Sequence, residues 1–206
     1  MKGEFVKLWR KMGVKGNPEE AFDFLNRLYS NPNRYYHNLN HIKSCLDELN
    51  YAKEEGIGKN LNAVEFATWY HDAIYDTKSK KNEEESALLA YHTCQEAELP
   101  LIFAQNVHDL VLVTKHNTTP KNIDEEIITD IDLAIFGKPL REFEKYEEGI
   151  RKEYLWVPKD KFKEGRSKIL QGFLDRPTIY CTSFFRERYE KQARINLKNS
   201  IEKLMS

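Results

Sequence analysis

Hydrophobic residues recur along most of this chain at the three- and four-residue spacing of an α-helix. Only 9 glycines and 7 prolines interrupt the 206 residues, and runs that alternate apolar and polar residues, as half-buried strands do, are scarce. We therefore predict an all-α fold: a single helical bundle of about eight to ten helices over residues 1–206. The clearest apolar stripe consists of Leu39, Ile42, Cys45, Leu46 and Leu49.

Capping residues and loop signals bound the expected helices. Asn17-Pro18 is typical of a helix start, because asparagine caps helices and proline suits the first helical position. Asn82 is likewise expected to cap a helix, with the acidic residues 83–85 in its first turn. The expected helices cover residues 4–12, 18–30, 38–55, 62–71, 82–97, 100–115, 124–136, 141–154, 158–174 and 183–205.

Charge and composition argue against several classes of protein. Lys and Arg total 32 and Asp and Glu total 33, a formal net charge of −1, so no general basic field attracts bulk nucleic acid. No apolar run reaches the ~20 residues that span a bilayer, and the first residues lack the apolar segment of a signal peptide. The three cysteines form no CxxC pair, which argues against a disulfide framework or a cysteine-based zinc site. We expect a cytoplasmic protein that does not bind membranes, and the sequence leaves a homodimer open.

Three short segments place imidazole and carboxylate groups in or beside apolar helices. The first contains His37 and His41, which share one helix face if the helix includes both. The second is His71-Asp72, where a nearly all-apolar helix ends, and the third is Asp130-Ile131-Asp132 within an apolar run. Burying such groups costs free energy unless they are paired, hydrogen-bonded or bound to a metal.

Each segment also has an ordinary structural explanation. A cationic His71 is favourable at a helix C-terminus, and Asp130 could cap a helix that begins at Ile131. The combination is harder to explain without a metal. Two imidazole nitrogens and two carboxylate oxygens suit one divalent ion, with open positions for water and substrate. The residue types do not distinguish Mn, Mg, Co, Ni, Fe and Zn.

The order H…HD…D resembles the HD-domain superfamily of metal-dependent phosphohydrolases. The wider pattern is similar to a group of predicted phosphohydrolases within that superfamily. The matching segments are RYYHNLNHI (34–42), WYHDAIYD (69–76), NEEESA (82–87), TKH (114–116), TDIDLAIFG (129–137), IRKEYLWVP (150–158), GRSKILQGFL (165–174) and ARINL (193–197). The resemblance implies an HD-type helical domain, with a metal-binding core at about 34–137 and a C-terminal helical part at about 140–206.

The first segment is also similar to the YHNxxHA motif of cyclic-nucleotide phosphodiesterases in the same superfamily. This resemblance implies that His37 is the acid for the leaving oxygen. Similarity to the DxD segments of other HD enzymes favours Asp132 as the last ligand and Asp130 as its neighbour, and either carboxylate could orient or deprotonate the water. Glu83, which follows the HD segment after a short loop, is a candidate to hydrogen-bond the water or a substrate hydroxyl. The implied metal ligands are His41, His71, Asp72 and Asp132. His71-Asp72 lacks the lysine or histidine continuation of several HD subfamilies, so a second metal is not indicated.

Four further residues are candidates for holding phosphate oxygens: Lys115, His116, Arg151 and Arg166. Structural salt bridges are an equal alternative for Arg151 and Arg166. The expected function is hydrolysis of a small phosphate ester, a nucleotide being one candidate, by metal-activated water. Two alternatives stay open: a di-iron oxygenase, with an extra ligand from His92 or His116, and a non-catalytic nucleotide-binding module.

Overall fold

The computed structural model describes residues 1–206 and is all-helical, as predicted. Every helix expected from the periodicity is present, most with bounds within two residues of those expected. None of the helices combines the length and apolarity that crossing a bilayer would require. The elements are α1 (Lys2–Lys11), α2 (Pro18–Tyr29), α3 (Leu39–Glu54), α4 (Leu61–Tyr70), α5 (Asn82–Glu96), α6 (Leu101–Val113), α7 (Ile123–Leu133), the 3₁₀ helix η1 (Ala134–Gly137), α8 (Leu140–Glu153), α9 (Lys159–Leu174) and α10 (Ser183–Met205).

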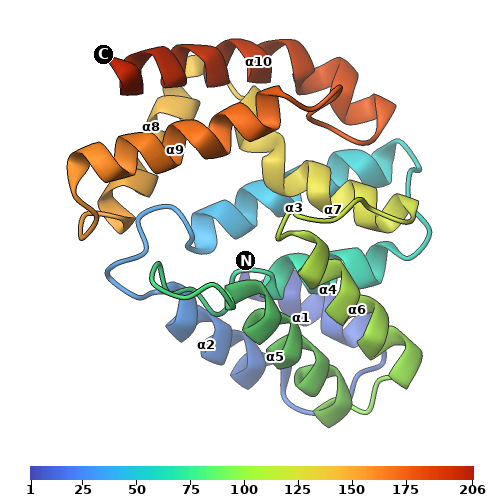
Figure 1. Cartoon of the computed structure of the whole chain (residues 1–206). Helices are drawn as coiled ribbons and strands as arrows, with labels where there is room; N and C mark the ends of the chain where they lie inside the picture. Colours follow the sequence, from blue (N-terminus) through green and yellow to red (C-terminus); the bar gives the residue numbers. More distant parts are fainter.

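Two helices, α3 and α7, cross the middle of the molecule (Figure 1). On one side lie α1, α2, α4, α5 and α6, and on the other lie α8, α9 and α10. α3 packs against α4 and α7, while η1 packs against α8 and α10. His41 and the Asp130-Asp132 segment therefore lie in the two central helices, and His71-Asp72 ends α4, which packs against both of them.

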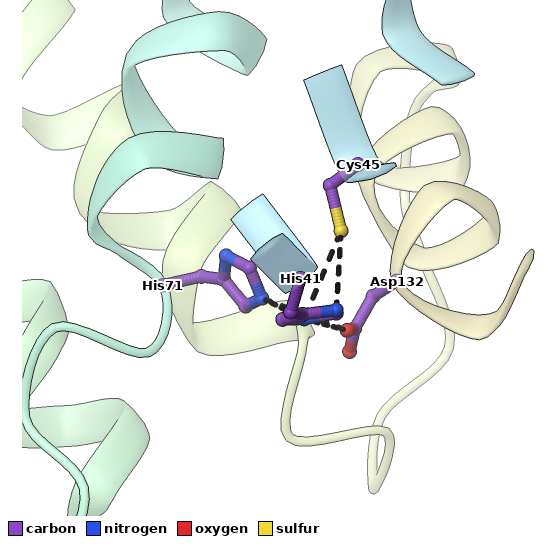
Figure 2. A group of neighbouring side chains, drawn as sticks. All are labelled: His41, Cys45, His71 and Asp132. Carbon is purple, nitrogen blue, oxygen red and sulfur yellow. Dashed lines mark hydrogen bonds and ion pairs between the residues drawn. The ribbon is translucent and has the colours of Figure 1, made fainter. Parts of the chain in front are cut away.

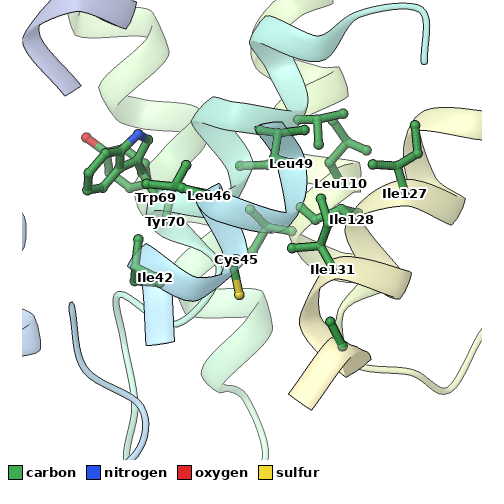
Figure 3. Close-up of a cluster of buried hydrophobic side chains, with 14 of the residues drawn as sticks. Ile42, Cys45, Leu46, Leu49, Trp69, Tyr70, Leu110, Ile127, Ile128 and Ile131 are labelled. Carbon is green, nitrogen blue, oxygen red and sulfur yellow. The ribbon is translucent and has the colours of Figure 1, made fainter. Parts of the chain in front are cut away.

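The predicted apolar stripe of α3 faces the core (Figure 3). Ile42 and Leu49 are fully buried against residues of α4, α6 and α7, among them Trp69 and Leu110. One cluster of 44 buried hydrophobic residues extends from Phe5 in α1 to Leu197 in α10. Burying each large apolar side chain contributes roughly 1.5–3 kcal/mol, so a continuous core of this kind unites all ten helices in one domain.

Asparagine side chains set the starts of two helices. Asn17 accepts hydrogen bonds from the amides of Glu19 and Glu20, as predicted for the cap of α2. Asn38 accepts from the amide of Asn40 and caps α3, which begins at Leu39. His37 therefore lies in the loop before the helix. The helix start expected near Asn38 is confirmed, and the condition under which His37 and His41 would share one helix face is not met.

The predicted cap at Asn82 is also corrected. Asn82 is the first residue of α5 and Lys81 precedes it in the cap position. The Asn82 carboxamide accepts from the amide of Asp76 and donates to the Asp76 carbonyl, both at 3.0 Å. It braces the loop between α4 and α5, which leads back from the His71-Asp72 segment.

A close backbone approach joins η1 to α10. A Cβ added to Gly137 would lie 2.4 Å from Cβ of Tyr189. Asn196 of α10 donates hydrogen bonds to the carbonyls of Phe136 and Lys138, both at 2.8 Å. Only glycine permits this contact, which holds Phe136 in place.

Replacing Gly137 with alanine is expected to lower the free energy of unfolding by about 1–3 kcal/mol, because the methyl group would force η1 and α10 apart. Urea denaturation followed by circular dichroism measures the change. Gly172→Ala is a matched control in α9, where an added Cβ meets nothing within 4 Å, and it should gain up to ~1 kcal/mol of helix propensity. Equal stability of the two variants would contradict the close approach.

Candidate metal centre

Three helix ends bring the predicted metal-binding side chains together (Figure 2). His41 lies in the first turn of α3, His71 ends α4, and Asp132 lies in the last turn of α7. Together with Cys45 they form a group that could hold a metal ion, with potential ligand atoms within 4.8 Å of one another. His41, His71 and Cys45 are buried, and Asp132 is partly exposed.

The spacing of these atoms fits the ligands of a single ion. The Nε2 atoms of His41 and His71 lie 3.1 Å apart, and Oδ1 of Asp132 lies 3.2 and 3.5 Å from them. Oδ2 of Asp72 lies 3.4 Å from the His41 nitrogen and 3.2 Å from the His71 nitrogen. Ligands about 2.1 Å from one ion are roughly 3.0 Å apart at right angles and roughly 3.4 Å apart in a tetrahedron. Asp72 thus belongs to the same constellation.

A backbone contact sets the tautomer of His71. Its Nδ1 lies 2.9 Å from the carbonyl oxygen of Thr68. A carbonyl only accepts, so Nδ1 carries the proton when the ring is neutral, and the Nε2 lone pair faces the cluster. Metal-binding histidines are oriented by outer hydrogen bonds of this kind.

Cys45 was predicted only as an apolar residue of the α3 stripe, and its presence in the group is a correction. Its Sγ lies 3.7 Å from both ring nitrogens of His41. Figure 2 shows the sulfur over the face of that ring, whereas the Nε2 lone pair lies in the ring plane. The signal in the sequence was the four-residue spacing from His41, which places both side chains on one helix face.

Opposite charges hold the buried groups together. Burial opposes protonation of His71, but the carboxylates of Asp72 and Asp132 outweigh it and raise its pKa well above the usual value. Burial raises the pKa of both carboxyl groups, but the surrounding histidines outweigh it and hold these pKa values well below the usual range. The carboxylates therefore stay ionised and require a positive partner, which is a protonated histidine or a metal ion.

A cleft of about 700 Å³ opens onto the exposed side of this centre, within the size range of small-molecule sites. His41 and His71 are not part of its lining and lie behind Asp72 and Asp132, buried to 5% and 3% exposure. Most of the predicted site residues line the cleft: His37, Asp72, Glu83, Lys115, His116, Asp132 and Arg166.

A buried carboxylate holds His37 at the wall of the cleft. Nδ1 of His37 lies 2.6 Å from Oε2 of Glu153, whose side chain is fully buried. Oε1 of Glu153 accepts from the amides of Tyr36 and His37 at 2.8 and 2.9 Å. Tyr75 stacks on the His37 ring with centroids 4.0 Å apart. Glu153 uses Nδ1, so Nε2 is the nitrogen left for a ligand. Sequence reasoning missed Glu153, which is 116 residues away.

Arg34 ties two of the segments together and was also missed. Its guanidinium donates to the carbonyls of His37 at 3.2 Å, Asp72 at 2.6 Å and Ala73 at 2.8 Å. These contacts hold the loop before α3 against the turn after α4. Both Arg34 and Glu153 lie within segments of the family resemblance, and this was the only signal in the sequence that marked them.

His116 contacts the outer oxygen of Asp132, which is Oδ2, the carboxylate oxygen that does not face His41 and His71. Its Nε2 lies 2.8 Å from Oδ2, so Oδ1 remains for His41 and His71. The His116 backbone is left-handed, with φ +57°, a conformation that costs on the order of 1–3 kcal/mol outside glycine. Arg176 donates to the His116 carbonyl at 2.9 Å and helps to hold it there.

Besides the buried His41 and His71, two more predicted site residues, Asp130 and Arg151, lie outside the cleft. Asp130 is buried in the middle of α7, where its carboxylate accepts from the amides of Cys181 at 2.6 Å and Thr182 at 2.8 Å, and from the Thr182 hydroxyl at 2.8 Å. The predicted catalytic role of Asp130 is therefore corrected to a structural one, and it caps no helix. Arg151 donates to the carbonyls of Tyr154 and Val157 at 2.8 and 3.2 Å, so it too braces the backbone.

The other two predicted cations line the cleft with their charges already offset. Lys115 pairs with Glu84 and lies 3.6 Å from Glu83. Arg166 pairs with Glu147 and donates to the Tyr146 hydroxyl. Each can contact an anion only while sharing its charge with a carboxylate.

Comparisons with protein-family models, with curated proteins and with solved structures found no match to this chain.

Replacing Asp130 with alanine is expected to destabilise the fold and leave Mn²⁺ affinity unchanged. Each buried amide left without an acceptor costs about 1–3 kcal/mol. Urea unfolding without metal and calorimetric titration with Mn²⁺ measure the two effects. Asp132→Ala, two residues along α7, is the matched variant and should lose metal binding. Loss of Mn²⁺ affinity in a folded Asp130→Ala protein would restore Asp130 to the metal centre.

Proposed function

We propose that this chain is an HD-type, metal-dependent hydrolase of small phosphate esters. One observation supports the proposal above all: two histidine nitrogens and two carboxylates converge behind a cleft of about 700 Å³, beside a histidine that a buried carboxylate orients. Metal-dependent hydrolysis requires such a ligand set, open to substrate on one side, with a proton donor in reach.

In this proposal the ligands are His41, His71, Asp72 and Asp132, and Cys45 packs on the His41 ring without ligating. The four nitrogen and oxygen atoms have the mutual spacing of ligands, whereas the sulfur lies off the plane of the His41 lone pair. When bound, a divalent ion lowers the pKa of a coordinated water and polarises a phosphoryl oxygen. His116 orients Asp132, and Thr68 orients His71.

His37 is the proposed acid. Hydrolysis joins a water oxygen to phosphorus and breaks the bond from phosphorus to the ester oxygen. The leaving alkoxide takes the proton from Nε2 of His37, and the attacking water gives up a proton to solvent. Glu153 fixes the His37 ring through Nδ1, 2.6 Å from its Oε2. Burial raises the pKa of Glu153, but its hydrogen bond with His37 outweighs this and lowers it.

The charge of the cleft suits a single phosphoryl group. Of the three lysines in its lining, Lys115 and Lys161 have carboxylates within 4 Å and Lys80 has none. Lys80 and Lys115 are the proposed contacts for phosphate oxygens, whereas Arg166 stays paired with Glu147 and Tyr146. Glu83 would accept a hydrogen bond from water or a substrate hydroxyl. A nucleoside monophosphate and simpler phosphate esters each carry a single phosphoryl group, so both suit the charge of the cleft.

The di-iron alternative is less well supported by the placement of the histidines. His92 lies on the exposed side of α5, where its Nδ1 is 3.2 Å from Oε1 of Gln95, and it does not line the cleft. Only His116 is near the proposed ligands, through Asp132.

Asp72→Asn is expected to weaken Mn²⁺ binding by at least ~10-fold, since even residues that only orient metal ligands contribute that much. Cys45→Ala should keep affinity close to that of the wild type. Calorimetric titration measures both, and circular dichroism checks that each variant folds. Equal losses would make Cys45 a ligand and contradict the proposed set.

His37→Asn is expected to lower kcat by about 10²–10⁴-fold, the usual contribution of a general acid, with Mn²⁺ affinity retained. Glu153→Gln should give a smaller loss and shift the pH profile of kcat, because it leaves His37 without its anionic partner. Glu148→Gln, on the exposed side of α8, is the control. Phosphate release from a panel of esters measures activity, and a metal-loaded wild type that hydrolyses none of them would overturn the proposed function.

A further inference from the structure

The cleft has two walls of different chemistry. The metal centre, His37 and the start of α5 supply its charged groups. The opposite wall is built by η1, α8 and α9, and it is mainly apolar. The apolar residues of this wall include Ile135, Phe136, Ile150, Phe162, Ile169 and Phe173, and its charged residues are Lys161 and Arg166.

A row of aromatic rings joins the two histidines that flank the centre. His116 lies 5.8 Å from Phe173, which lies 5.0 Å from Phe136. The row continues from Phe136 to Tyr146 at 6.0 Å, from Tyr146 to Tyr36 at 4.5 Å, and from Tyr36 to His37 at 5.0 Å, measured between ring centroids. A substrate with its phosphoryl group between His116 and His37 therefore has this row along one side.

The polar atoms of the same wall are already engaged. The Tyr146 hydroxyl accepts from Arg166 at 2.5 Å, and the Arg166 guanidinium pairs with Glu147. Arg151 donates to backbone carbonyls. The hydroxyl groups of a sugar would lose their water there and find few partners, which costs free energy.

Ile169 extends the apolar wall to the mouth of the cleft. It lines the cleft and is 53% exposed to solvent. An apolar group of the ligand that extends past the aromatic row would cover the Ile169 side chain. This contact removes apolar surface of the ligand and of Ile169 from water, which is favourable.

We infer that the substrate is a phosphate ester of an apolar alcohol, with an alkyl or aryl group lying along η1 and α9. This inference rests on the proposed function and narrows it. It places the phosphoryl group at the metal centre and the hydrocarbon against Phe136, Phe173 and Ile169. A sugar phosphate or a nucleotide would fit the metal end of the cleft but not its apolar wall.

The test compares n-alkyl phosphates from methyl to hexyl. Their leaving alcohols have closely similar pKa values, so differences in kcat/KM report contacts with the alkyl chain. We expect kcat/KM to rise by up to about fourfold for each added methylene, equivalent to ~0.8 kcal/mol. Pentyl phosphate should be a better substrate than ribose 5-phosphate, which has the same number of carbon atoms and is polar. A flat series, or higher kcat/KM for ribose 5-phosphate or for a nucleoside monophosphate, would overturn the inference.

Ile169→Ser should reduce the rise in kcat/KM for each added methylene. Ile195→Ser, at an isoleucine of α10 that is 43% exposed and does not line the cleft, is the matched control and should leave that rise unchanged. Binding of n-alkylphosphonates from methyl to hexyl, measured by calorimetry on the Mn²⁺-loaded protein, separates the two proposals. Rising affinity without hydrolysis of any ester would support the placement of a hydrocarbon group along η1 and α9 and overturn the hydrolase. Affinity independent of chain length would overturn the inference alone.

Discussion

The structure is organised around the cost of burying charge. Two histidines and two carboxylates lie where three helix ends meet, with His41 and His71 almost without access to solvent. Such groups are stable inside a protein only when they neutralise one another or a bound ion. The convergence of the start of α3, the end of α4 and the end of α7 supplies that neutralisation. The apolar faces of the same helices, packed in the central core, hold the three ends in place.

A second set of contacts keeps the polar groups aligned. Arg34 joins the loop before α3 to the turn after α4, Glu153 reaches across from α8 to orient His37, and His116 takes the outer oxygen of Asp132. Each contact uses a hydrogen bond to a charged group, which is stronger than one between neutral groups. The donors and acceptors that would face a ligand are thereby held before the ligand arrives, which lowers the cost of binding.

The two parts of the chain make different contributions to the cleft. The proposed metal ligands all come from residues 41–132, whereas the apolar wall comes from η1, α8 and α9. Gly137 and Asn196 attach η1 to α10, and Asp130 attaches α7 to the segment before α10. The C-terminal helices are thus built into the site, and Glu153 of α8 orients His37 beside the metal centre.

The sequence by itself determined the helices, because their apolar periodicity and the cap at Asn17 depend on near neighbours. It also marked most residues of the centre, since charged groups in apolar helices are conspicuous. Partners distant in the chain were invisible to it: Glu153 is 116 residues from His37, and nothing local signals that pairing.

The choice between Asp130 and Asp132 was likewise left to tertiary structure. Two residues are separated by roughly 200° around a helix, so the two carboxylates point to opposite sides of α7. Only the packing of α7 decided which one meets His41 and which one meets Thr182.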